Sequence, residues 1–146
     1  MKLCTLVVGA LALAAPRLAA AESHKLLVLQ SEGRADAATR SKIDAAIFRL
    51  ALAVEPQAAA GELNFTDAAT AVGCRPEAPA CKDEVLGMLG VDEIVITTVT
   101  PKPGGLEIAV RRVGKGGVAR DAVAVIPSGP LPERLDGIAP LFGGAA

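Results

Sequence analysis

The sequence is poor in the residues on which many sugar and nucleic-acid sites rely. It has three Phe, no Trp, no Tyr and a single His among 146 residues. Sugar-binding platforms and base-stacking surfaces depend on aromatic faces, so the composition disfavours both classes. The 15 basic and 16 acidic residues leave a formal net charge of −1, which offers no basic footprint for nucleic acid. We therefore expect no nucleic-acid partner.

Candidate catalytic groups are equally scarce. The one histidine, His24, lies close to the expected mature N-terminus, and no pattern around it indicates a Ser-His-Asp or Cys-His unit. Residues 114–117 read Gly-Lys-Gly-Gly but lack the spacing of a phosphate-binding loop, so they predict a hairpin turn. The acidic pairs at 83–84 and 92–93 join neighbours whose side chains diverge, which is typical of solvated surface charge. We predict no enzymatic activity, no metal site and no cofactor.

The first 21 residues are typical of a secretory signal peptide. Lys2 gives a positive start, residues 3–15 form an apolar stretch, and the small residues Ala19 and Ala21 suit a signal peptidase. The apolar run is shorter than the ~20 residues of a spanning helix, which argues against a membrane anchor. Cys4 lies at the start of this stretch rather than at its end, so we expect no lipidation. We predict cleavage after Ala21, a periplasmic or secreted product, and no membrane span after cleavage.

Removal of this segment would leave two cysteines, Cys74 and Cys81, in a single domain over residues 22–146. An even pair in an oxidising compartment favours a disulfide. A zinc half-site is disfavoured because zinc takes four ligands and the chain has one histidine. A redox dithiol is disfavoured because the spacing is not C-x-x-C. Closure of so short a loop should stabilise the fold by about 2 kcal/mol.

Hydrophobic periodicity predicts alternating strands and helices. Residues 24–30 carry a continuous apolar run typical of a central strand, and Asp36 is the expected N-cap of a helix that ends before Pro56. A weak second strand is expected at 63–65, followed by a brief helix capped by Thr66 or Asp67. Further elements are expected as a helix at 82–89 that stops at Gly90, strands at 91–100, 106–113 and 118–126, and a C-terminal helix at 130–142.

This order predicts an α/β fold with one core. The expected architecture is a single two-layer sandwich, in which helices pack on a mixed sheet of about five strands. The early strands would be parallel, with right-handed crossovers, and the last three would form an antiparallel meander.

The cysteine pair, the short helix after it and the phrase LGVDEIVITTVTPKPGGLEIAVRRV give the chain a family resemblance. In this order the elements resemble the α/β domain at the N-terminus of TolB and of related bacterial envelope proteins. The resemblance covers residues 25–142 and implies an envelope protein that works through protein contacts. It supplies no catalytic residues. TolB carries a β-propeller after this domain, whereas the present sequence ends.

Our leading hypothesis is an exported, non-enzymatic interaction or accessory module with an envelope protein as partner. Its contact surface would lie on the edge hairpin over residues 91–126, where a free sheet edge could accept a partner strand. The residues expected on this surface are Ile108, Val110, Arg112 and Val123. The alternative is a small-ligand or nucleotide-like binding domain that uses the loop after the first strand, because α/β sheets bind ligands beyond the carboxyl ends of their strands.

Overall fold

A computed structural model describes residues 23–132 and 135–143, so the expected signal peptide lies outside the described residues. The first half of this region contains β1 (Leu26–Val28), β2 (Glu32–Gly33), α1 (Ala37–Val54), β3 (Ala59–Ala60), α2 (Phe65–Val72) and α3 (Cys81–Leu89). The second half contains β4 (Glu93–Lys102), β5 (Gly105–Gly114), β6 (Ala119–Pro127) and two short 3₁₀ segments, η1 (Lys115–Gly117) and η2 (Ala139–Leu141). No helix in these ranges is long and apolar enough to cross a bilayer.

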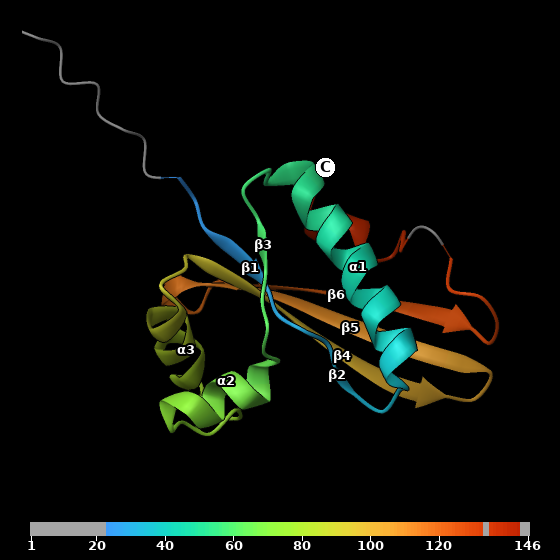
Figure 1. The fold of residues 1–146 in the computed structure, drawn as a ribbon, viewed down its shortest axis with the longest axis horizontal. Helices are drawn as coiled ribbons and strands as arrows, with labels where there is room; N and C mark the ends of the chain where they lie inside the picture. Colours follow the sequence, from blue (N-terminus) through green and yellow to red (C-terminus); the bar gives the residue numbers. More distant parts are fainter. Residues whose placement is uncertain (1–22, 133–134, 144–146) are drawn as a thin grey trace, which may run out of the picture.

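The six strands form one mixed sheet in the order β3-β1-β4-β5-β6, with β2 paired to the far end of β4 (Figure 1). Strands β1, β2 and β3 make parallel pairs, whereas β4, β5 and β6 form an antiparallel meander. The predicted α/β class, the mixed sheet and the C-terminal meander are confirmed.

Alternate residues of β4 divide the core into two clusters. Val95 and Val99 pack with α1 and with residues 135–142, which we call the C-terminal segment, whereas Ile94 and Ile96 pack with α2 and α3. We call the first side of the sheet the α1 face and the second the open face. Helices α2 and α3 cover only one end of the open face (Figure 1). Thr98, further along β4, is therefore exposed.

Helix α1 follows the predicted pattern closely. The Asp36 side chain accepts a hydrogen bond from the Thr39 backbone N–H at 2.8 Å, which satisfies one of the free donors at the helix start. Ile43, Ala46 and Ile47 are buried at spacings of three and four, as expected for the stripe that faces the sheet.

Two expected elements differ from the structure. The strand expected at residues 63–65 lies instead at Ala59–Ala60 (β3). Helix α2 begins after Asn64, whose side chain caps the helix by accepting from the Asp67 N–H. Asn64 is therefore the cap, and the expectation of Thr66 or Asp67 was wrong.

The C-terminal helix expected at 130–142 was also wrong. Among the described residues of this segment only Ala139–Leu141 is helical, as a single 3₁₀ turn. Gly137 weakens a helix and Pro140 lacks the N–H that an α-helix needs in its interior. The apolar positions still enter the core, because Leu135, Ile138 and Leu141 are buried on the α1 face.

Candidate functional site

Strand β6 forms one edge of the sheet, and its outward backbone groups follow from its register. Gly114 N–H donates to the Val118 carbonyl at 2.8 Å, and Ser128 N–H donates to the Gly104 carbonyl at 2.7 Å. Because hydrogen-bonded positions alternate in an antiparallel pair, even-numbered residues of β6 face β5. The N–H and C=O groups of Ala119, Asp121, Val123 and Val125 therefore point away from the sheet. Within the described ranges, β5 is the only strand paired with β6.

The side chains at these outward positions lie on the open face, and two of them are large and apolar. Val123 is 53% exposed and Val125 is 68% exposed, and Val118 in the preceding turn is also 68% exposed. Three of the seven exposed large hydrophobic side chains among the described residues thus lie on β6 or next to it. Two of the three, Val123 and Val125, lie two residues apart on the open face, and apolar groups gathered on one face commonly mark a contact site.

A cleft of about 480 Å³ lies on the open face beside β6. Its apolar lining includes Phe65 from α2, Ile96 from β4, Ala109 from β5 and Val123 from β6. The opposite wall consists of Pro76, Glu77 and Lys82, which belong to the loop before α3 and to the start of that helix. The volume falls within the ~300–1,000 Å³ that is usual for binding pockets.

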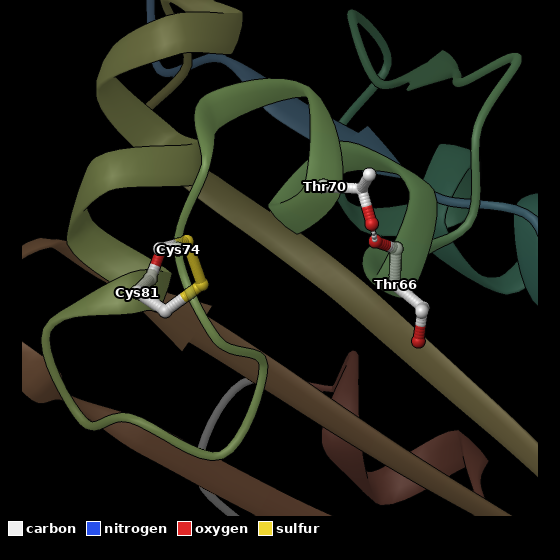
Figure 2. The surroundings of a disulfide bond; sticks show 4 residues. All are labelled: Thr66, Thr70, Cys74 and Cys81. Atoms are coloured by element: carbon white, nitrogen blue, oxygen red, sulfur yellow. Dashed lines mark hydrogen bonds between the residues drawn. A yellow bond between two sulfur atoms is a disulfide. The ribbon is translucent and has the colours of Figure 1, made fainter.

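A disulfide closes the loop that forms this wall. Cys74 and Cys81 are joined with their Cα atoms 5.4 Å apart, and Cys81 is the buried first residue of α3. Figure 2 shows the bond between the end of α2 and the start of α3, near Thr70, whose hydroxyl donates to the Thr66 carbonyl. The bond therefore holds the loop close to α2 and α3, which pack on the sheet.

Two charged contacts lie at the cleft. Arg111 donates to both carboxylate oxygens of Asp121, at 2.5 and 3.2 Å, and this hydrogen bonding raises the pKa of the Arg111 guanidinium. The Lys82 ammonium lies 5.8 Å from the centre of the Phe65 ring, a cation–π distance. Glu77, by contrast, makes no ion pair with any described residue.

The four residues expected on the contact surface separate into two groups. Val123 is exposed on the open face, but Ile108, Val110 and Arg112 are buried on the α1 face at 0%, 1% and 7% exposure. The period-two alternation of β5 turns these three side chains toward α1 and the C-terminal segment. They cannot touch a partner, so the available surface of the hairpin is the open face.

Arg112 belongs to a group of ion pairs on the α1 face. Its guanidinium contacts the Glu93 carboxylate and lies 3.6 Å from Glu55, and His24 lies 3.2 Å from Glu93. A buried guanidinium needs such partners because desolvation of an unpaired charge is costly. Glu93 is thus an internal partner rather than the solvated charge that the sequence indicated.

The remaining candidate groups have structural partners. Asp83 accepts from the Gly116 N–H at 3.2 Å, and Asp92 accepts from the Lys25 N–H at 2.8 Å and lies 3.4 Å from Lys115 Nζ. Residues 114–117 connect β5 to β6, as expected for a hairpin turn. Between residues 23 and 143, apart from 133–134, no group of three His, Cys, Asp or Glu side chains could hold a metal ion.

The loop after β1, which the alternative hypothesis uses, is tied to the sheet. Arg34 N–H donates to the Val99 carbonyl at 3.0 Å, and Gly33 pairs with Val99. A smaller hollow of about 220 Å³ lies next to this loop and includes Ser31 and Arg40. Its volume is below the usual range for a ligand pocket.

The C-terminal segment approaches β6 from the α1 face. A side chain at Gly137 would place its Cβ 3.0 Å from the Val123 carbonyl oxygen and 3.4 Å from the Ala124 Cβ. Gly137 therefore lies against the edge strand at its middle, and the open face is the side from which Val123 is accessible.

Comparison with solved structures shows a shared fold. Lipoprotein GNA1162 from Neisseria meningitidis superposes with a TM-score of 0.51 at 14% identity, covering 72% of this chain and 81% of that one. The LpoB C-terminal domain from Salmonella enterica gives a TM-score of 0.48 at 9% identity, with coverage of 73% and 84%. No family model matches the sequence, and no curated protein matches it. The GNA1162 similarity, at this identity, concerns the fold alone.

Proposed function

We propose that this chain is an exported, non-enzymatic interaction module that binds a protein partner on the open face of β4, β5 and β6. One observation carries the proposal: Val123 and Val125 are exposed side by side on an edge strand, next to a cleft with an apolar lining. Contiguous apolar groups bordered by charged ones are typical of protein contact sites.

The charged groups near the cleft support a binding role. Arg111 and Asp121 pair with each other, and the two cysteines are joined in a disulfide, so neither pair presents a free nucleophile or base. His24 pairs with Glu93 on another part of the molecule. A binding function needs only the apolar side chains that line the cleft and the charged side chains around them.

We place the module at the bacterial envelope. The disulfide is typical of proteins from oxidising compartments, and the fold is shared with a protein described as a lipoprotein. The element order and the cysteine pair also support the TolB N-terminal-like assignment.

Intact mass measurement of the exported protein should give a chain that begins at Glu22; a chain that keeps residues 1–21 would contradict signal cleavage.

The proposal can be tested by charge substitution on the open face. Partner capture by mild crosslinking from the native envelope would be compared for the mature protein, Val123→Asp, Val125→Asp and the control Val54→Asp. Val54 is 38% exposed on α1 and lies away from the cleft. We expect the open-face variants to lose a partner that the control retains, at unchanged Tm.

The opposite result would place the protein contact away from the open face. If Val123→Asp and Val125→Asp both retain the same partners as the control, the open face is not the contact surface. Arg34→Glu, which alters the loop after β1, would then show whether capture depends on that loop.

A further inference from the structure

Acidic side chains outnumber basic ones in the segment that contains α2 and α3. Residues 62–84 contain five acidic residues and two basic ones, a formal net charge of −3. Glu77 of this segment and Glu32 of β2 line the cleft directly. This wall faces the apolar side chains of Ile96, Ala109 and Val123 across the cleft.

The two cations at the cleft offset only part of the negative charge of the carboxylates that line it. Arg111 is bonded to Asp121 through both carboxylate oxygens, so its charge is already matched. Lys82 lies over the Phe65 ring and keeps its charge, so the charged side chains that line the cleft leave a net charge of −1. Glu32 accepts only a 3.3 Å hydrogen bond from the Thr66 N–H, and neither Glu32 nor Glu77 forms an ion pair with a described residue.

We infer that the partner segment docked on the open face carries apolar side chains flanked by Lys or Arg. This inference rests on the proposed function and names the chemistry of its partner. The apolar side chains fill the cleft beside Val123, and the cationic groups lie against Glu32 and Glu77. Charge complementarity of this kind steers association and selects among partners more than it adds affinity.

The docking direction follows from the C-terminal segment. Because Gly137 lies against the Val123 carbonyl on the α1 face, a partner meets Val123 from the open side, where Glu32 and Glu77 line the cleft. A single partner segment can therefore contact both the exposed valines and the two carboxylates.

A randomised peptide library, selected on the immobilised mature protein with its disulfide intact, tests the inference. Enriched sequences should combine apolar residues with Lys or Arg, and synthetic copies would be measured by fluorescence polarisation at low and high salt. For these peptides Glu77→Lys should weaken binding about fivefold, the size expected for reversal of a rim charge. Glu62→Lys is the matched control, since Glu62 is exposed on the same segment but outside the cleft.

The outcomes separate this inference from the proposed function. Peptides that lose binding with Val123→Asp but show no preference for basic residues, or bind Glu77→Lys and Glu62→Lys equally, overturn the inference and leave the contact face standing. Absence of enrichment, or peptides insensitive to Val123→Asp, contradicts the contact face itself.

Discussion

Arg112 lies directly opposite Arg120 in the ladder between β5 and β6, so two like charges face each other across the strands. Such a pair is destabilising unless one charge is compensated. Glu93 and Glu55 compensate Arg112, whereas Arg120 is exposed to solvent. The carboxylates that make this register tolerable come from β4 and from the end of α1, so the ion pairs tie three elements together.

Removal of Arg112 should therefore cost far more than removal of its neighbour. Arg112→Ala should lower the free energy of unfolding by about 2–3 kcal/mol, less than for a fully buried pair because Glu93 and Glu55 keep 20% and 31% exposure. Arg111→Ala, which breaks a pair whose arginine is 48% exposed, should cost no more than about 1 kcal/mol. Urea denaturation measures both, and equal losses would contradict the internal role of Arg112.

Gly33→Ala should destabilise the sheet strongly. Gly33 has φ +115°, and a Cβ there would lie 2.1 Å from the Val99 carbonyl oxygen, a distance that backbone atoms cannot tolerate. The expected loss is at least about 2 kcal/mol. Gly87→Ala in α3 is the control, since its Cβ meets nothing within 4 Å and the change should be neutral or stabilising by up to about 1 kcal/mol. A tolerated Gly33→Ala in thermal unfolding would show that β2 does not pair with β4.

The Cys74→Ala/Cys81→Ala double variant should lose about 2 kcal/mol of stability, as for a short closed loop. Amide exchange in residues 75–80 should rise, because the bond holds this loop beside α2 and α3. Exchange in the middle of β5 should change little. Unaltered exchange in the loop would mean that packing alone holds the cleft wall.

The free energy of unfolding should fall at acid pH because two carboxylates, Asp36 and Asp92, become protonated. A hydrogen bond from the Lys25 N–H lowers the pKa of Asp92 below its ordinary value of 3.8, and the Thr39 hydroxyl does the same for Asp36. Since the folded pKa is depressed, the stabilisation is present above 3.8 and is lost as the pH falls toward the folded pKa. Urea unfolding from pH 6 to pH 2.5 should show this acid limb.

Asp92→Asn should flatten the acid limb, because the variant cannot bind a proton there. Glu62→Gln removes an exposed carboxylate without a hydrogen bond among the described residues and is the matched control. A limb that keeps its slope in Asp92→Asn would exclude this carboxylate as its source.

Local signals account for much of the fold. The N-cap at Asp36 and the helix stop at Gly90, which has φ +64°, were predictable because each depends on chemistry within one turn of chain. The C-terminal segment was harder, since its apolar spacing fits a helix but Gly137 and Pro140 remove it. Burial there depends on the α1 face rather than on local backbone preference.

The candidate site was less accessible to sequence reasoning. Arg112 continues the period of Ile108 and Val110, so alternation alone places it on the buried face. Because arginine is charged, we expected Arg112 at the surface. The carboxylates that compensate its charge, Glu55 and Glu93, are distant in the sequence. No short sequence pattern predicts the cleft, because Glu77 and Val123 are far apart in the sequence. They line the same cleft only because the sheet and the disulfide-closed loop bring them together. One sequence feature did indicate an exposed apolar surface: in residues 121–125 the larger side chains of Asp121, Val123 and Val125 alternate with alanines.

The contact between Gly137 and the Val123 carbonyl also bears on aggregation through the edge of the sheet. Residues 122–126 read Ala-Val-Ala-Val-Ile, an uncharged and β-prone stretch on a sheet edge, which is the usual nucleus for stacking of identical strands into fibrils. Pro127, which has no N–H to offer, follows this stretch, and the C-terminal segment stands over its middle. A shortened chain without residues 131–146 would expose that stretch and would also lose the buried side chains of Leu135, Ile138 and Leu141, so it should both unfold more readily and form fibrils.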